Sequence, residues 1–219
     1  MTESNKPGKS QRPVFAPFLI TVLGLGELWA RGSMIRSAQM IDRFGLRWED
    51  FALPLQWYRV LTSPYVQPEA DLGISLLALL ALLVLLIAAE RRFGTWQTVR
   101  TFVITDVISS LAVFVGLHIA ELNGNRWAAI IHRRDGGASS GTIGVVLEFL
   151  LALQQTWIRR SLIGVLGLVL LHALIFSREL ADIQHVAAAF VGYAIARSSS
   201  RAQTTQAMLS VGERNTEAV

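Results

Sequence analysis

The run LGISLLALLALLVLLIAA, residues Leu72–Ala89, contains no charged side chain and determines the fold class of the chain. A helix that crosses a bilayer needs about 20 mostly apolar residues, with about 17 as the lower limit. The run therefore predicts a transmembrane helix. Five further segments have the same character with more polar residues: Val14–Ala30, Thr101–Ala120, Ser139–Ile158, Ser161–Phe176 and Ile183–Ala196. Together the six segments predict an all-α, polytopic membrane protein built as a six-transmembrane-helix bundle.

The composition of the 219-residue chain agrees with this prediction. Hydrophobic residues make up 52% and charged residues only 16%, whereas charged residues make up about 25% of a typical soluble domain. The absence of cysteine excludes thiol chemistry, thiolate metal sites and disulfides. The arginines that raise the pI to about 10.1 lie scattered between the apolar segments. This distribution favours contact with anionic lipid headgroups over binding of nucleic acid.

The two ends of the chain differ in character from the middle. Residues 1–13 and 198–219 are polar and rich in Ser, Thr and Gln, so we expect two disordered tails around a membrane domain of residues 14–197. If the N-terminus is cytoplasmic, eleven Lys and Arg residues lie on the cytoplasmic side and nine on the other. Because positive charge favours the cytoplasmic side, we expect both termini in the cytoplasm, in a multi-pass protein of a bacterial-type plasma membrane.

The segment that joins the first two predicted spans, about residues 31–71, is rich in aromatic and arginine side chains. Trp48, Trp57 and Tyr58 lie there among five arginines. Such amphipathic side chains suit the interface between bilayer and water. Two interpretations stay open: an aromatic belt at the interface, or a structured loop partly embedded beside the first helix.

Four short motifs occur in order along the chain. QWYRVLTSPYV lies in the first loop, and AERRFGTW follows the uncharged run. GASSGTIG starts the fourth predicted span, and HVAAAFVG lies in the sixth. The residues that define the motifs are Trp57, Arg59, Glu90, Arg91, Gly94, Gly137, Ser139, Gly144, His185 and Gly192.

In order and spacing, these motifs resemble the rhomboid family of intramembrane serine proteases, over roughly residues 14–197. The resemblance implies a six-helix membrane domain that cleaves transmembrane protein substrates with a Ser-His dyad and no acidic third member. It implies no metal ion and no organic cofactor. Its implied partners are transmembrane proteins and the lipid bilayer, not nucleic acid.

The chemistry of a serine nucleophile can also be followed from the residues alone. A hydroxyl is a poor nucleophile unless a base within hydrogen-bond reach takes its proton. Among the four histidines, only His185 begins a helix whose following face is made of alanine and glycine. The fourth span has a matching small face through Ser140 and Gly144, and two such faces allow helices to approach closely. The alternative is that both faces serve packing alone.

Two adjacent serines compete for the role of nucleophile. Ser139 has Gly137 two residues before it and Gly144 five residues after it, as in the family pattern. Ser140 has only the directly following Gly141 in place. We therefore predict Ser139 as the nucleophile and keep Ser140 as the alternative. Either hydroxyl would lie at a helix N-terminus, where the backbone N–H groups from Ser139 to Gly141 can stabilise a developing oxyanion.

The chain departs from the family at the start of the second span. Active rhomboids have a histidine and an asparagine there, one helical turn apart, that help to bind the oxyanion. The equivalent positions hold Asp71 and Ser75, and Gln67 replaces a histidine of the loop. An ionised carboxylate only accepts hydrogen bonds, whereas a serine hydroxyl can donate one. Two functions follow: an intramembrane serine endopeptidase, or a rhomboid-like pseudoprotease that binds membrane clients without cleaving them.

Other polar residues lie in or near the predicted spans and are candidates for function by default. Glu148 lies nine residues after Ser139, about 13 Å along a helix, so we expect a structural role for it. Asp182 lies three residues before His185 and could orient the imidazole, but we expect it to be the N-cap residue of the sixth helix. A transporter or ion pathway around Asp106, Glu148 and His172 is a weaker hypothesis, because the sequence has no evident inverted repeat.

Overall fold

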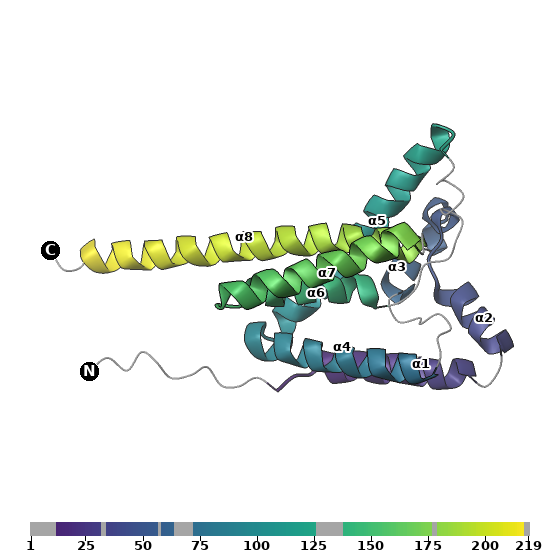
Figure 1. Cartoon of the computed structure of the whole chain (residues 1–219), viewed down its shortest axis with the longest axis horizontal. Helices are drawn as coiled ribbons and strands as arrows, with labels where there is room; N and C mark the ends of the chain where they lie inside the picture. The colour runs from purple at the N-terminus through teal and green to yellow at the C-terminus, as the bar shows by residue number, and fades with distance from the viewer. Residues whose placement is uncertain are drawn as a thin grey trace.

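The computed structural model describes residues 12–31, 34–56, 58–63, 72–125, 138–176 and 179–216. Every regular element in these ranges is helical, which confirms the all-α class. Figure 1 shows their arrangement. The elements are α1 (Phe15–Arg31), α2 (Met34–Phe44), the 3-10 helices η1 (Trp48–Ala52) and η2 (Pro54–Gln56), α3 (Arg59–Thr62), α4 (Leu72–Phe93), α5 (Thr95–Leu122), α6 (Ser139–Leu151), α7 (Thr156–Phe176) and α8 (Leu180–Thr216).

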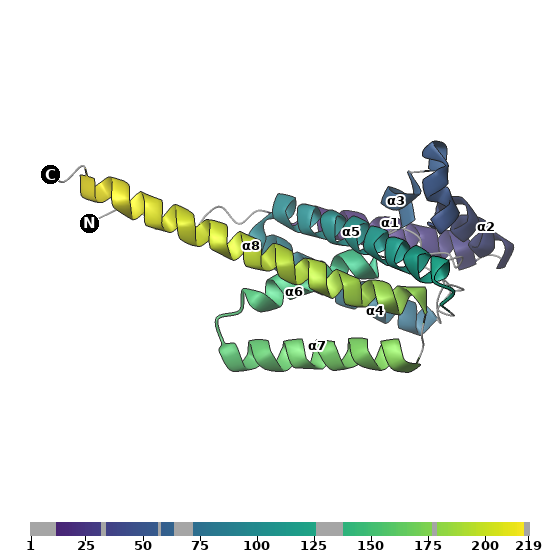
Figure 2. The same ribbon diagram turned by 90° about the horizontal axis from the view of Figure 1, so that it is seen from above.

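Three helices form the centre of the bundle. Helix α6 packs most extensively against α8, and α5 packs against both. Helix α1 lies along α4 and, with it, covers another side of α5 and α6. Helix α7 lies at the edge, with fewer contacts to α6 and α8, and Figure 2 shows it set apart from the other helices. The centre therefore contains both helices that carry the candidate dyad.

Glu90 joins the start of α1 to the junction of α4 and α5. Its carboxylate accepts hydrogen bonds from the backbone N–H groups of Val14, Phe15 and Ala16, at 2.7–3.1 Å, and from the Thr95 hydroxyl at 2.6 Å. The first N–H groups of a helix have no partner within the helix, and an anion there also interacts favourably with the helix dipole. Burial alone would raise the pKa of Glu90, but these hydrogen bonds outweigh it and hold the pKa below its usual value.

The centre of the bundle is polar on the face of α5 that meets α6 and α8. Glu148 of α6 is buried and accepts hydrogen bonds from Gln97 and Thr101, both at 2.7 Å. Near the other end of this face, Gln184 of α8 donates to the hydroxyl of Ser110. Membrane helices associate through close packing and interhelical hydrogen bonds, since lipid tails are as apolar as leucine. The buried hydroxyl residues of the face are Thr98, Thr101, Thr105, Ser109 and Ser110.

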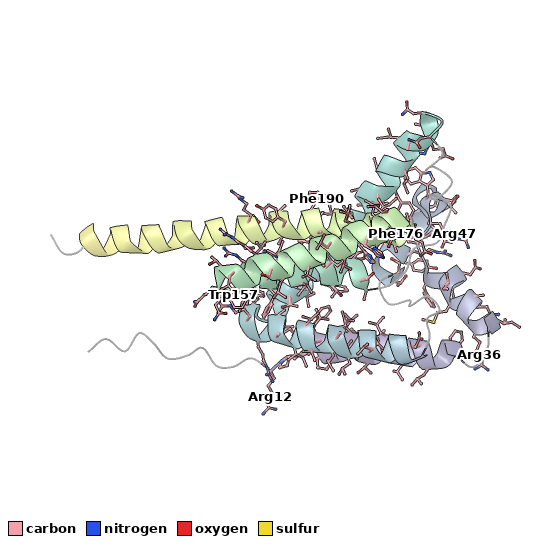
Figure 3. The ribbon with its side chains drawn as sticks, viewed as in Figure 1. Arg12, Arg36, Arg47, Trp157, Phe176 and Phe190 are labelled. Atoms are coloured by element: carbon pink, nitrogen blue, oxygen red, sulfur yellow. The ribbon has the colours of Figure 1, made fainter. Side chains whose placement is uncertain are left out.

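The outer surface is largely apolar. None of the residues of α7 is buried, and its Trp157, Leu168 and Phe176 are each about 70% exposed. Figure 3 shows Trp157 and Phe176 on this helix and Phe190 on α8. Apolar patches of this extent on a protein surface mark contact with a membrane or another protein. Helices α5 and α7 are long and apolar enough to cross a membrane, and α1 and α6 are apolar but shorter.

Two predicted boundaries are wrong. The fourth segment was expected to run to Ile158, but α6 ends at Leu151, and residues 152–155 connect it to α7. The amides of Ala152 and Leu153 turn back to carbonyls of the last helical turn, and the polar Gln154 and Gln155 follow. At 13 residues, α6 is about 20 Å long.

The C-terminal tail was expected to be disordered from residue 198, but α8 continues to Thr216. No proline follows Pro68, so nothing in this stretch removes a helical N–H. Alanine, glutamine, arginine and methionine between residues 201 and 209 also favour a helix. Of the N-terminal tail, residues 1–11 lie outside the described part of the chain.

Candidate active site

Ser139 and His185 lie next to each other, although 46 residues separate them in the sequence. Ser139 is the first residue of α6, and His185 lies in the second turn of α8. Nε2 of His185 is 2.7 Å from Oγ of Ser139, a hydrogen-bond distance. For Nε2 to accept the hydroxyl proton, the neutral ring must carry its own proton on Nδ1. The closeness expected from the two small faces is therefore present.

Glycines allow the helices that carry this pair to touch through their backbones. A Cβ added at Gly192 of α8 would lie 2.6 Å from Cα of Gly144 in α6. A Cβ at Gly144 would overlap the side chain of Thr105 in α5, and one at Gly141 would lie 2.8 Å from the ring of Phe102. No side chain larger than hydrogen fits at these three glycines without a shift of the neighbouring atoms. They therefore determine how α6 sits against α5 and α8.

The structure separates the two candidate serines. Ser139 is exposed at the N-terminus of α6, whereas Ser140 is only 2% exposed. Successive residues of an α-helix point about 100° apart, since a turn holds 3.6 residues. The hydroxyl of Ser139 meets His185. Ser139 is thus the serine placed for proton transfer, and Ser140 belongs to the buried face.

The expected oxyanion site is described only in part. The first α-helical bond within α6 runs from the amide of Thr142 to the carbonyl of Ala138 at 3.1 Å. The amides of the preceding first-turn residues are the ones that a helix cannot satisfy internally. Ser75 lies in α4, but its side chain is not among those that the structure describes. Gly137, Asp71 and Gln67 lie outside the described residues.

A cavity of about 260 Å³ opens beside Ser139, between α4 and α6. Its walls are mostly apolar, and Ser139 and Thr142 are the hydroxyl residues among them. The hydroxyl of Thr142 donates to the carbonyl of Ala138 at 2.6 Å, so it is already satisfied. The remaining lining residues are Leu79, Ala81, Leu82, Leu85, Ala138 and Ile143. An apolar segment of a polypeptide could therefore approach the serine from this side.

The other acidic and histidine candidates make hydrogen bonds or packing contacts within the bundle, or are buried in it. Asp182 is not the N-cap residue, because α8 begins at Leu180 and Asp182 is its third residue. It accepts a hydrogen bond at 2.9 Å from the amide of Glu179, as the third helical residue of a capping box does. Glu148 has the structural role expected for it, with Gln97 and Thr101 as partners. The sequence did not identify these two partners, although their spacing places both on one face of α5. His172 is exposed on α7, where its ring lies 4.5 Å from that of Phe176 at an angle of 37°, while Asp106 is buried in α5.

No group of three or more His, Asp or Glu residues that could hold a metal ion occurs in the described ranges.

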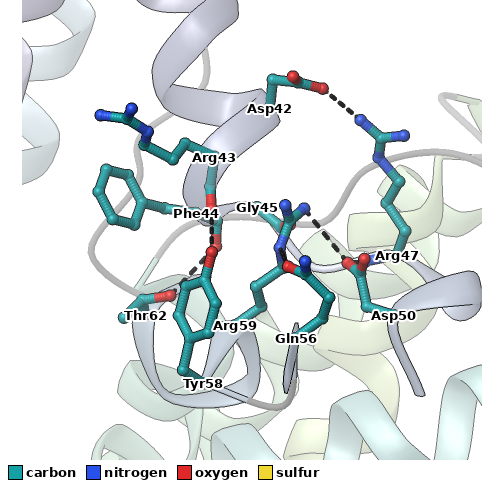
Figure 4. Close-up of polar contacts among 10 residues, drawn as sticks. All are labelled: Asp42, Arg43, Phe44, Gly45, Arg47, Asp50, Gln56, Tyr58, Arg59 and Thr62. Atoms are coloured by element: carbon teal, nitrogen blue, oxygen red, sulfur yellow. Dashed lines mark hydrogen bonds and ion pairs between the residues drawn. The ribbon is translucent and has the colours of Figure 1, made fainter. Parts of the chain in front are cut away.

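The described part of the first loop, residues 34–56 and 58–63, is built of short helices, which agrees with a structured loop. Figure 4 shows Arg59 at its centre. The guanidinium of Arg59 donates to Gln56 at 2.8 Å and to the carbonyl of Gly45 at 3.1 Å, and it pairs with Asp50 at 3.4 Å. The Tyr58 hydroxyl donates to the carbonyl of Arg43 at 2.9 Å. Trp57 lies outside the described residues.

The motif after the uncharged run lies at the turn between α4 and α5. Gly94 has φ of 85°, a conformation that favours glycine, and it is the single residue between the end of α4 and the start of α5. Glu90 is buried at this turn, and the side chain of Arg91 is exposed.

No family model matches the chain, and no curated protein sequence is significantly similar to it. The resemblance to rhomboids therefore rests on the short motifs and their order.

Proposed function

We propose that the chain is an intramembrane serine endopeptidase of rhomboid type that cleaves transmembrane protein substrates. The observation that supports this most directly is the 2.7 Å distance between Oγ of Ser139 and Nε2 of His185. A serine and a base within hydrogen-bond reach are the minimum for nucleophilic catalysis by a hydroxyl. The apolar cavity beside Ser139 and the helix N-terminus at which it lies add to the proposal.

In the proposed reaction, Nε2 of His185 takes the hydroxyl proton while Oγ of Ser139 attacks the carbonyl carbon of a peptide bond. The carbonyl oxygen becomes an oxyanion, which the N–H groups in the first turn of α6 stabilise, because the first amides of a helix have no partner within it. His185 then returns the proton to the leaving amine, and an acyl-serine forms. A water molecule, deprotonated by the same histidine, hydrolyses this ester and restores Ser139.

The proposal places the helices in a membrane as six spans: α1, α4, α5, α6, α7 and α8. The length and hydropathy of α5 and α7, the uncharged run of α4 and the exposed apolar surface of α7 support it. Six spans require both termini on the same side. Reporter fusions at residue 5 and residue 210 therefore should give the same location, and opposite locations would reject the six-span arrangement.

A fluorophosphonate probe tests the dyad without knowledge of the substrate, because it reacts only with an activated serine. Ser139→Ala and His185→Ala should each abolish labelling of the membrane-reconstituted protein, since members of one catalytic unit act together. Ser140→Ala is the matched control and should retain most of the labelling. Labelling that disappears in Ser140→Ala but persists in Ser139→Ala would contradict the assignment.

A second candidate function is a pseudoprotease that binds membrane clients. The observation that favours it is the occupation of the two second-span oxyanion positions by Asp71 and Ser75. Loss of one oxyanion donor costs about a hundred- to a thousandfold in rate in well-studied hydrolases. A wild-type chain that captures a transmembrane client in a cross-linking experiment but never labels with the probe would favour this second function.

A further inference from the structure

One end of the bundle carries a group of exposed arginines, which we call the arginine rim. Its members come from five different segments of the chain but share this end: Arg12, Arg91, Arg92, Arg100, Arg160 and Arg197. Figure 3 shows Arg12 and Trp157 towards one end of the molecule and Arg36 and Arg47 towards the other. The rim is therefore separated from the first loop by the length of the helices.

Hydrogen bonds place the first four members together. Arg12 precedes α1, whose first amides bind Glu90, the neighbour of Arg91. Arg91 and Arg92 lie in the last turn of α4. Gly94 then turns the chain directly into α5, which carries Arg100 in its second turn.

The other two members reach the same end through α6. Gln97 of α5 donates to Glu148, so the C-terminal end of α6 lies beside the N-terminal end of α5. The short connection 152–155 leads from there to Arg160 near the start of α7. Helices α6 and α8 run in the same direction, because Ser139 meets His185 and Gly144 meets Gly192. Arg197 therefore lies near the level at which α6 ends.

The rim lacks counter-charges within the described part of the chain. The acidic side chains next to it are Glu90 and Glu148, and both are buried and already accept hydrogen bonds from other groups. No described carboxylate lies within 4.0 Å of a rim guanidinium, although Arg197 donates to the Tyr193 hydroxyl. At the other end, Arg47 pairs with Asp42 and Arg59 with Asp50. Among the described residues, the rim guanidinium groups are therefore exposed and open to an anion from outside the bundle.

We propose that the arginine rim binds the phosphate groups of anionic phospholipids in the leaflet at this end. Two tryptophans flank the rim, Trp96 at 77% and Trp157 at 71% exposed, and tryptophan is enriched where the bilayer meets water. The apolar surfaces of α5 and α7 begin directly behind these residues, which places the guanidinium groups at the depth of lipid headgroups. This inference rests on the membrane embedding proposed above and not on proteolysis.

The test uses the full chain in two kinds of bilayer. One contains phosphatidylcholine with brominated phosphatidylglycerol, and the other contains phosphatidylglycerol with brominated phosphatidylcholine. Quenching of tryptophan fluorescence by each brominated lipid gives the relative association of the anionic and the zwitterionic headgroup. Each arginine near an anionic surface contributes to this preference. Arg91→Gln with Arg92→Gln should lower the preference for phosphatidylglycerol by about tenfold, or about 1.4 kcal/mol. Arg36→Gln with Arg43→Gln, two exposed arginines of α2 at the other end, is the matched control.

The results distinguish failure of the lipid-binding proposal from failure of the proposed membrane embedding. Equal association of both lipids with the wild type, or an equal loss in the α2 control, would overturn the rim as the binding surface. Competition by millimolar inorganic phosphate in phosphatidylcholine bilayers would instead identify a site for free phosphate and overturn the headgroup proposal. Failure of the chain to insert into any bilayer would reject the membrane embedding itself.

Discussion

Substitution of Gly192 by alanine tests whether the contact between α6 and α8 sets the geometry of the dyad. The added Cβ would lie 2.6 Å from Cα of Gly144 and 3.1 Å from its carbonyl oxygen. Ordinary contacts begin near 3.4 Å, so the shortfall is about 0.8 Å. Both obstructing atoms belong to the backbone, and a packed interior cannot absorb such an overlap by rotating a side chain. The two helices must therefore move apart.

If this displacement reaches the dyad undiminished, the distance between Oγ of Ser139 and Nε2 of His185 grows from 2.7 Å to about 3.5 Å. That is beyond the usual range of a hydrogen bond. Misplacement of a reacting group by about 1 Å can cost about a hundredfold in rate. We expect Gly192→Ala to slow fluorophosphonate labelling of Ser139 by between about tenfold and about a hundredfold. Overpacking should also destabilise the protein by about 1–3 kcal/mol.

Gly164→Ala on α7 is the matched control, because a Cβ there would meet nothing within 4 Å. It introduces the same methyl group into a helix and should label at the wild-type rate, with unchanged or slightly higher thermal stability. Equal labelling of the two folded variants would refute the link between this glycine contact and the dyad. If the wild type itself never labels, the dyad proposal fails, and the unfolding midpoints of the two variants still test the packing.

Three further predictions concern the polar groups. Because the pKa of Glu90 is lowered, its contribution to stability should be complete above the usual carboxyl value of 4.5 and disappear as the pH falls through the folded-state pKa. Thermal unfolding of Glu90→Gln should therefore show lower stability at neutral pH and less acid dependence, and parallel pH profiles would contradict this. Glu148→Ala leaves the buried hydroxyl of Thr101 and the partly buried amide of Gln97 without their acceptor and should cost about 2–4 kcal/mol; a loss below about 1 kcal/mol in denaturant unfolding would show that the network is dispensable. Asp71→His with Ser75→Asn should raise a low labelling rate by up to about a hundredfold, and silence of both folded proteins would leave the client-binding function.

The ends of helices were harder to predict than their existence. Hydrophobic runs identified the segments in which α1, α4, α5, α7 and α8 form, because a long apolar stretch without proline beyond its first turn favours a helix in an apolar surrounding. The end of α6 lies in a short local turn, where the amides of Ala152 and Leu153 bond carbonyls of the last helical turn, and the apolar residues on both sides of it concealed the break. The continuation of α8 depends on the absence of a breaker, which a polar composition alone does not reveal.

The pattern of small residues predicted that two helix faces, one with the serines and one with His185, would meet. Small residues on both helices indicated that Ser139 or Ser140 would approach His185, but the choice between adjacent serines depends on a rotation of about 100° about the helix axis. That rotation is set by Gly141 against Phe102 and Gly144 against Thr105. These contacts involve α5, a third helix that the spacing of the motifs does not describe.

The stability of the bundle and the geometry of the dyad depend on the same contacts. In a bilayer, burial of apolar surface gives little drive for helix association, so backbone proximity and interhelical hydrogen bonds must provide it. Gly144 against Gly192 and Glu148 with its partners on α5 are such contacts, and they join α5, α6 and α8. The hydrogen bonds of Glu90 join α4 to the start of α1. Helix α7 buries no residue and contributes no such contact. Substitutions at these contacts in the three central helices should therefore change stability and labelling together, whereas an exposed substitution on α7 such as Gly164→Ala should change neither.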